Sequence, residues 1–401
     1  MPAAPSSLAR LDPDRGGVLA RILKSRRLAW FLARIGIVVG RWWGRPFRLG
    51  EIVLVIRHRD IETVLSHDLD YLIAPVNGPR FTELGFPFIL GMDRTQILAS
   101  ERASLYSALD AIDFEPMRTA AADDVAARLA GHGGSIDFIE DLARPVAAAT
   151  AGRLVGLAMV PADLMAMSRP LFEHSFLNQQ NDRKVAAVAH QAAAMLSDAL
   201  SAAIKARRAQ GNFGNSLLDR LLQVGAGVDL TRRTLAGIFV GAIDTTATAA
   251  AKSLWVLASR RVWLDAATRD RDDPDRLYGW CCDAMRRWTH VPIISRQAVG
   301  SSAIGGTAID DGAKIIMWTQ AAMADVEAFL DPGTLRPDRP QRRYLHLGGG
   351  LHPCAGRAIN AWQVPLLVGS VLGEGVRKVA VPAWSGPFPD SMRLTLAGSA
   401  A

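Results

Sequence analysis

Residues 344–357 of this chain read Tyr344-Leu-His-Leu-Gly-Gly-Gly-Leu-His-Pro-Cys354-Ala-Gly-Arg357, a lone cysteine in a glycine-rich run. The glycines permit positive φ and a close approach of the backbone to a flat ligand, and Pro353 stiffens the chain before the sulfur. The pattern that follows predicts a helix over 355–368, so Cys354 is expected at a helix N-terminus, where partial positive charge stabilises a thiolate. Taken alone, the run is more simply explained as a buried cysteine beside an ordinary glycine turn.

The spacing around this cysteine resembles the haem-ligand loop of the cytochromes P450. The shared positions are glycines six and four residues before the cysteine, a histidine two before it, and a glycine then an arginine after it, namely Gly348, Gly350, His352, Gly356 and Arg357. The resemblance implies that Cys354 is the metal ligand of a thiolate-ligated haem b (iron protoporphyrin IX) and that the glycines lie against the cofactor. The family usually has phenylalanine seven before the cysteine. This chain has Leu347 there, which affects redox tuning more than ligation.

Length and composition fit one large catalytic domain. The chain has 401 residues, of which 49% are hydrophobic, so it can bury a sizeable core. No linker rich in Ser, Gly and Pro follows the N-terminal tail, and we expect a lead segment over 1–44 and a single haem-thiolate domain over 45–401. The resemblance implies a mainly α (α-rich α+β) cytochrome P450 fold, with a large helical region and small β-sheets.

Cysteine content and charge restrict the compartment and the partners. The chain has three cysteines, Cys281, Cys282 and Cys354, without the spacing of a zinc-finger site. This small, odd number excludes a disulfide framework and fits a protein of the reducing cytoplasm. The net charge of +7 comes from dispersed arginines and predicts no nucleic-acid partner. No transmembrane segment is expected, because a bilayer takes about 20 apolar residues and the apolar stretch 28–40 is shorter. A packed helix is favoured there over a weak membrane association of the N-terminal segment.

The hydrophobic pattern predicts a small β element early, a long helical middle and a mixed C-terminal quarter. Residues 48–58 are expected to form a strand, followed by a short helix over 59–65. Helices rich in alanine and leucine fill 101–258. Short strands punctuated by glycine are expected over 301–318.

A second group of polar residues lies in an apolar segment that we expect to be one helix, Leu235-Ala-Gly-Ile-Phe-Val-Gly-Ala-Ile-Asp-Thr-Thr-Ala-Thr248. An acid inside such a helix is costly unless it is hydrogen-bonded or functional. Alternatively, Asp244 points to solvent and Thr245 returns its hydroxyl to the carbonyl four residues back. The run resembles the distal-helix motif of the P450 family, which implies that Asp244 and Thr245 are catalytic and supply the protons for O–O cleavage.

A third pattern is an acid and an arginine three residues apart, Asp283-Ala-Met-Arg286, on one helical face. An intrahelical ion pair explains such spacing in many proteins. The P450 family has glutamate-x-x-arginine here, completed by an arginine that corresponds to Arg339. The resemblance implies a structural network of Asp283, Arg286 and Arg339 that braces the ligand loop. Aspartate is one methylene shorter than glutamate, so we expect Asp283 to reach only one arginine or to require a closer helix.

The resemblance also implies cationic contacts to the haem propionates from Arg102, Arg296 and His352. Arg102 follows a Met-Asp turn as in the family, but Leu98 replaces the aromatic residue usual four positions earlier. A solvent-exposed ion pair with Glu101 or its neighbours explains Arg102 equally well.

The substrate pocket is expected to be apolar. By position in the family it is lined by Phe172, Phe176, Val240, Ile243, Val291, Ile293 and Phe388. These residues fit a small apolar organic substrate without identifying it. Each of them is equally well explained as part of the hydrophobic core.

Together these features resemble a soluble bacterial-type haem-thiolate monooxygenase, which inserts one atom of O2 into its substrate and reduces the other to water. No GxGxxG strand-helix unit for a nicotinamide or flavin is present. Electrons are therefore expected from a ferredoxin-type donor with its reductase, attracted by Arg342, Arg343 and Arg357.

Two other classes of function stay open. The same haem can act as a peroxygenase or in oxidative coupling, and the acid-threonine pair argues against the peroxide route but not against coupling. A non-catalytic haem-binding protein is the second alternative. The Asp244-Thr245 pair argues against this alternative, because a binding protein has no need of proton delivery. The residues at Leu98, Asp283 and Leu347, which differ from those usual in the family, keep it open.

Overall fold

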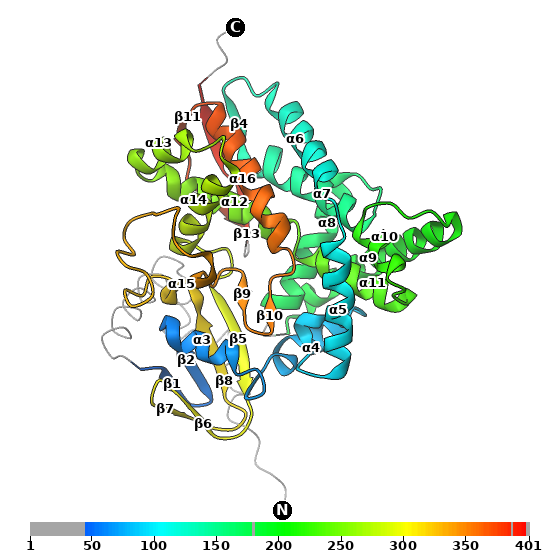
Figure 1. The fold of residues 1–401 in the computed structure, drawn as a ribbon, viewed down its shortest axis with the longest axis vertical. Coiled ribbons are helices and arrows are strands. Elements are labelled where there is room, and N and C mark those ends of the chain that lie inside the picture. Colours follow the sequence, from blue (N-terminus) through cyan, green and yellow to red (C-terminus); the bar gives the residue numbers. More distant parts are fainter. Residues whose placement is uncertain (1–44, 179–180, 386–387, 398–401) are drawn as a thin grey trace, which may run out of the picture.

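The computed structural model describes residues 45–178, 181–385 and 388–397, so the lead segment over 1–44 lies outside the described residues. Helices fill most of the molecule; the five-stranded sheet lies at one end and the β11-β14-β4 sheet at the other, with β9, β10 and β13 between them (Figure 1). The mainly α prediction is confirmed. The longer helices are α3 (His58–Ser66), α4 (Ala74–Glu83), α5 (Gln96–Asp110), α6 (Glu115–Leu129), α7 (Arg144–Val155), α8 (Pro161–Phe172), α9 (Arg183–Gln210), α10 (Leu217–Gln223), α11 (Val228–Val240), α12 (Asp244–Ala258), α13 (Arg261–Arg269), α14 (Pro274–Arg287) and α16 (Arg357–Gly373).

Shorter elements connect these helices. The helical turns are η2 (Ile89–Gly91), η3 (Phe138–Ala143), η4 (Glu173–Leu177), α15 (Thr319–Ala322) and η5 (Gln341–Arg343). The strands are β1 (Phe47–Leu49), β2 (Ile52–Val55), β3 (Tyr71–Leu72), β4 (Ser135–Asp137), β5 (Ile293–Ala298), β6 (Ser302–Ile304), β7 (Thr307–Ile309), β8 (Lys314–Trp318), β9 (Gly348–Gly349), β10 (His352–Pro353), β11 (Val376–Val379), β12 (Ala383–Ser385), β13 (Phe388–Ser391) and β14 (Arg393–Leu396).

The largest sheet has the order β1-β2-β8-β5-β3, and only its β2–β8 pair is parallel. The single strand predicted over 48–58 is wrong. Gly50, with a φ of 59°, turns the chain so that β1 pairs antiparallel with β2, and α3 already begins at His58. Positive φ is inexpensive only for glycine, which accounts for the hairpin.

The predicted single helix over 235–248 is also wrong, because it is interrupted between α11 and α12. The amides of Gly241 and Ala242 bond to carbonyls three residues back instead of four. The hydroxyls of Thr245 and Thr246 then take the carbonyls of Gly241 and Ala242, in competition with the helical ladder. Asp244 therefore begins α12 rather than lying inside a longer helix.

One contiguous hydrophobic core joins the sheets to the helices, from Val53 on β2 to Leu396 on β14. Within the described residues, Val228–Ala258 is the stretch long and apolar enough to cross a membrane, and most of it is buried inside this core. Burial among protein side chains explains its apolar character.

Candidate functional site

The cysteine loop lies in the middle of the molecule, between the five-stranded sheet and α16 (Figure 1). β9 pairs antiparallel with β10, and both Gly348 and Gly350 have positive φ. A Cβ at Gly350 would lie 1.8 Å from the carbonyl oxygen of Leu65, so glycine is required there because α3 packs against the loop. The Cys354 amide donates to the Leu347 carbonyl (2.8 Å), which closes the loop around the sulfur.

Cys354 differs from the other two cysteines in being exposed. Surrounding protein still desolvates the thiol and raises its pKa, while a hydrogen bond from the Gly356 amide and the charge of Arg357 lower it. Cys281 and Cys282 are buried, and burial raises the pKa of Cys282 to about 12. Among the three, Cys354 is therefore the thiol placed to act as a ligand.

Three cationic or ring-nitrogen groups lie beside this loop. Arg102 of α5 donates to the Leu351 carbonyl, and Glu101 pairs instead with Arg233 (2.8 Å), so the exposed Glu101 pair considered for Arg102 is wrong. Burial lowers the pKa of Arg296 to about 10. Burial, with the charges of Arg296 and Arg102, lowers the pKa of His352 to about 4.

Both ring nitrogens of His352 are buried and have no hydrogen-bond partner in the described structure. A buried polar atom without a partner is uncommon and indicates a missing acceptor or donor. Two arginines and an unpartnered imidazole suit the carboxylates of an anionic cofactor, and the exposed thiol lies nearby in sequence. The residues present therefore fit a thiolate-ligated haem.

Tyr106 was not among the predicted site residues. Its hydroxyl is buried without a partner, and the guanidinium of Arg102 lies 5.2 Å from its ring centroid. The sequence offered one indication of this contact, because residues four apart on a helix, such as Arg102 and Tyr106 on α5, are neighbours on its surface.

Asp244 is buried, so the alternative in which it faces solvent is wrong. Its Oδ1 accepts from Nε (3.0 Å) and Nη2 (2.8 Å) of Arg169, and Nε of Arg144 lies 2.9 Å away. Its Oδ2 is buried and has no partner. Thr245 donates to the Gly241 carbonyl, as that same alternative expected. The Asp244 carboxylate, with one oxygen bound by arginines and the other without a partner, therefore lies next to the half-buried Thr245 in sequence.

The two arginines that hold Asp244 were missed in the sequence, as was Asp390. Arg169 lies 75 residues before Asp244 and also donates to Asp390, which lies 221 residues after Arg169. No local spacing relates positions so far apart. Only the packing of α7, α8 and the β12–β13 hairpin against α12 brings them together.

The structure brings Asp283, Arg286 and Arg339 together. Oδ1 of Asp283 lies 2.5 Å from Nε of Arg286 and 3.2 Å from Nε of Arg339, so the shorter acid reaches both arginines. Oδ2 accepts from the Arg336 amide (2.8 Å), and the Tyr344 hydroxyl donates to Oδ1 (3.2 Å). Asp273 caps α14 by accepting from the Arg276 amide, which fixes the start of the helix that carries this network.

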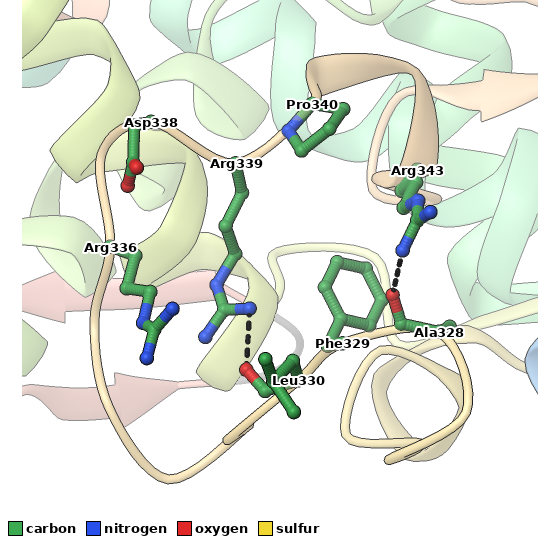
Figure 2. Close-up of a pocket in the computed structure, with 8 residues that line it drawn as sticks. All are labelled: Ala328, Phe329, Leu330, Arg336, Asp338, Arg339, Pro340 and Arg343. Carbon is green, nitrogen blue, oxygen red and sulfur yellow. Dashed lines mark hydrogen bonds between the residues drawn. The ribbon is translucent and has the colours of Figure 1, made fainter.

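Both arginines also bind the segment that leads to the cysteine loop. Arg286 donates to the carbonyls of Met323 and Pro332 (3.0 Å each), and Arg339 donates to those of Leu330 (2.8 Å) and Asp331 (2.9 Å). Figure 2 shows Arg339 beside a pocket of about 200 Å³ on this segment. Its lining consists of Ala328, Phe329, Leu330, Arg336, Asp338, Arg339, Pro340 and Arg343.

Phe172, one of the predicted substrate-pocket residues, packs against two others. The ring centroid of Phe172 lies 4.8 Å from that of Phe176 and 4.9 Å from that of Phe388. Val240 and Ile243 are buried on either side of the break between α11 and α12. Val291 is half-buried, and Ile293 is exposed at the start of β5. Their roles stay predictions.

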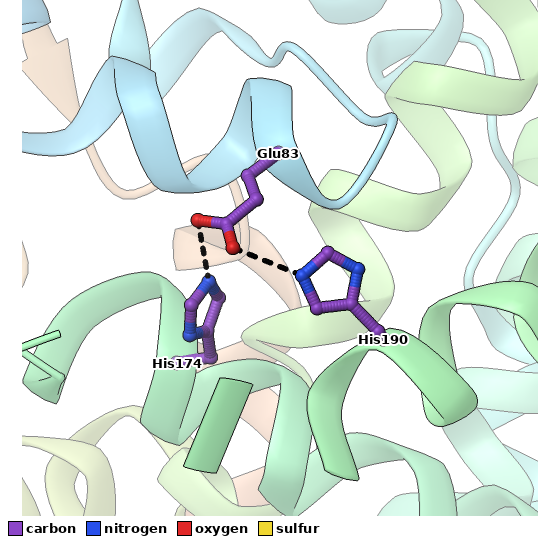
Figure 3. Close-up of side chains that lie close together, drawn as sticks. All are labelled: Glu83, His174 and His190. Atoms are coloured by element: carbon purple, nitrogen blue, oxygen red, sulfur yellow. Dashed lines mark hydrogen bonds and ion pairs between the residues drawn. The ribbon is translucent and has the colours of Figure 1, made fainter. Parts of the chain in front are cut away.

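Glu83, His174 and His190 meet where α4 approaches η4 and α9, and Figure 3 shows one carboxylate between two imidazoles. Glu83 lies 3.3 Å from Nε2 of His174 and 3.0 Å from Nε2 of His190. The Asn178 amide donates to Nδ1 of His174, so the ring proton lies on Nε2 and points to Glu83. A metal-ligating histidine needs that nitrogen unprotonated. The cluster is therefore a polar contact that joins α4 to η4 and α9.

Comparison with known proteins gives a consistent result. No family model matches the chain. It is 25% identical to nocardicin C N-oxygenase of Nocardia uniformis subsp. tsuyamanensis over 84% of this chain and 85% of that protein. It is 28% identical to steroid C26-monooxygenase of Mycobacterium tuberculosis strain CDC 1551 over 60% of this chain and 64% of that protein.

Solved structures share the fold at low identity. CalO2 superposes with a TM-score of 0.79 and 18% identity, covering 92% of this chain and 96% of that one. Substrate-free CYP109E1 from Bacillus megaterium superposes with a TM-score of 0.77 and 16% identity, covering 90% and 97%.

Proposed function

We propose that this chain, a member of the cytochrome P450 superfamily, is a haem-thiolate monooxygenase acting on an apolar organic molecule. Its relatives in the comparison are named as an N-oxygenase and a steroid monooxygenase. When bound, the haem supplies the activation of O2, and the protein supplies position, electrostatics and protons. The single observation that carries the proposal is the exposed Cys354 thiol beside the unpartnered ring of His352.

The loop residues have separate roles in this proposal. Cys354 is the metal ligand, and the Gly356 amide and Arg357 charge favour its thiolate. Arg102, Arg296 and His352 hold the propionates through charge-assisted hydrogen bonds. Leu347, Gly348, Gly350 and Gly356 shape the loop around the cofactor, and Asp283, Arg286 and Arg339 brace the segment before it.

Asp244 and Thr245 move the protons that O–O cleavage requires. The free Oδ2 of Asp244 is able to take a proton and pass it on, while Oδ1 stays held by Arg169 and Arg144. Within the described residues, a Cβ on Gly241 would meet only the Ile238 carbonyl oxygen, at 4.0 Å, so the space beside Gly241, whose carbonyl accepts from Thr245, is open. General acids of this kind typically contribute about 10²–10⁴-fold.

Electrons come from a separate protein, which we propose to be a ferredoxin-type donor with its reductase. Arg342 and Arg343 on η5 and Arg357 at the start of α16 are exposed. Positive charge at one surface steers an acidic partner and raises the association rate at low ionic strength. The substrate contacts proposed are the apolar residues from Phe172 to Phe388 named above.

The test is replacement of the ligand. Cys354→Ser protein should lose the red-shifted thiolate band of the reduced CO-difference spectrum, whereas Cys281→Ser and Cys282→Ser proteins should keep it. A band that persists in Cys354→Ser overturns the proposal. Product formed with O2 and a reductase, measured against product formed with peroxide alone, then separates a monooxygenase from a peroxygenase and from a non-catalytic haem protein.

A further inference from the structure

Arg169 on α8 lies between two carboxylates. Its Nε and Nη2 donate to Asp244 (3.0 and 2.8 Å), and its Nη1 donates to Asp390 on β13. Asp244 is buried, whereas Asp390 is partly exposed at the other side of the guanidinium. One positive charge is therefore divided between the proton-carrying acid and a second acid from the C-terminal hairpin.

Carboxylates outnumber arginines in this cluster. Arg144 also pairs with Asp244, and Glu173 on η4 faces the same group. Burial raises the pKa of Glu173, and the charges of Asp244 and Asp390 raise it further, against the lowering effect of Arg169. Competition for Arg169 is therefore built into the cluster, because Asp244, Asp390 and Glu173 all interact with it, whereas among the described residues Arg144 pairs with Asp244 alone.

The hairpin that carries Asp390 also carries a predicted substrate contact. Phe388, two residues before Asp390, lies 5.8 Å below the Arg169 guanidinium and packs edge-on against Phe172. At its other end, Trp384 packs against Trp288 and lies 5.1 Å from the ammonium of Lys252 on α12. The strand that carries Asp390 therefore also contacts Phe172, one of the predicted substrate-pocket residues, and the guanidinium of Arg169.

We propose that Asp390 is a positioning residue for the proton donor. By sharing Arg169 with Asp244, Asp390 weakens the hold on Asp244 and leaves its free Oδ2 able to turn and exchange a proton. The inference rests on the proposed function, because Asp244 is given its role there.

A stability measurement tests the sharing without any turnover. Asp390→Asn should lower Tm modestly, because Arg169 keeps Asp244, and Asp244→Asn should lower it by more, because Arg144 also loses its acid partner. The double variant should lower Tm by more than the sum, since it leaves the mostly buried Arg169 without an acid partner from this pair. Asp124→Asn is the matched control: Asp124 pairs with Arg153 (2.8 Å) at similar exposure and should be additive with Asp244→Asn. Additivity for Asp390 as well would overturn the proposal.

Turnover tests the positioning. In haem-loaded Asp390→Asn, electrons should be diverted to peroxide, product formation should fall roughly 3- to 10-fold, and the solvent deuterium isotope effect should rise, with unchanged substrate affinity by spectral titration. Asp390→Ser should behave in the same way, and Asp390→Glu should restore coupling. Ser391→Ala, which removes a hydrogen bond from the same hairpin to Asp137, should have no such effect.

Two outcomes separate this inference from the proposed function. A normal thiolate CO band with unchanged peroxide yield in Asp390→Asn, or equal uncoupling in Ser391→Ala, overturns the inference and leaves the monooxygenase proposal standing. Absence of the band in the unaltered protein overturns the proposed function itself.

Discussion

Asp283 and Asp244 are two buried aspartates, each held by two arginines, with exposed fractions of 0% and 2%. They differ in how their oxygens are used. Both oxygens of Asp283 accept hydrogen bonds, including one from the Arg336 amide and one from the Tyr344 hydroxyl. Asp244 receives all its donors on Oδ1, and its Oδ2 has none.

The difference teaches what each site can do. A carboxylate with donors on both oxygens is fixed in orientation and has no lone pair to spare for a proton, as a structural brace requires. A carboxylate with one free oxygen can take up and release a proton while its other oxygen stays in place. Burial and paired arginines alone therefore do not distinguish structure from catalysis.

The largest expected effect is on the brace. Arg286→Ala strands the charge of Asp283 at full burial, a loss that typically costs about 3–5 kcal/mol, so we expect insoluble chain or protein without haem. Asp283→Glu should be tolerated better than Asp283→Asn, because it keeps the charge between Arg286 and Arg339. The measurement is soluble yield and the haem-to-protein absorbance ratio. Arg276→Ala is the control, an exposed arginine of the same helix paired with Asp270. Soluble Arg286→Ala protein with its full haem content would contradict a structural role for Asp283 that differs from the role of Asp244.

The next effect is on rate, at the other aspartate. Asp244→Asn keeps an oxygen for Arg169 but cannot carry a proton, so turnover should fall about 10²–10⁴-fold with haem content unchanged. Thr245→Ala should keep haem and divert electrons to peroxide. Single-turnover kinetics with peroxide detection measure both. Equal rates in the variants and the parent would place the proton route elsewhere.

Lys252 is a third buried ionisable residue, and its hydrogen-bond partner is a backbone carbonyl instead of an oppositely charged side chain. Its ammonium donates to the Thr289 carbonyl (2.7 Å) and lies 5.0 Å from the Trp288 ring, and burial lowers its pKa to about 7. The unfolded chain, with a lysine pKa near about 10.4, binds more protons between these values, so stability should rise as pH increases from about 7 to 10.

Lys252→Met should flatten this rise, which amounts to at most about 1.4 kcal/mol per pH unit. Thermal unfolding between pH 7 and 10 gives the measurement. Arg271→Met, at an exposed position, is the control and should keep the parent slope. An unchanged slope in Lys252→Met would mean that Lys252 keeps an ordinary pKa.

The smallest expected effect comes from Tyr344→Phe. It removes one of several donors to Asp283, and Arg286, Arg339 and the Arg336 amide remain. We expect a loss of about 0.5–1.5 kcal/mol in the free energy of unfolding, with the haem retained. Denaturant titration checks it. A loss as large as that of Arg286→Ala would show that the brace depends on every donor.

The sequence by itself determined the fold class and the glycine-rich loop around Cys354. Spacing within a loop or a helix is local, so the glycines around Cys354 and the three-residue step from Asp283 to Arg286 were readable directly. The sequence also shows aspartate at position 283 where the family has glutamate, but it does not show whether the shorter side chain still reaches both arginines. Whether a shorter acid reaches Arg339 depends on how closely the 323–339 segment packs against α14.

Only the tertiary structure decided the surroundings of Asp244. Its partners Arg144 and Arg169 lie on other helices, and Asp390 reaches Arg169 from 221 residues away. Charge pairing over such separations follows from helix packing and carries no local pattern. The break after α11 has a different, local origin. The hydroxyls of Thr245 and Thr246 compete for the carbonyls of Gly241 and Ala242, and the helical periodicity of 235–248 does not show which of these bonds form.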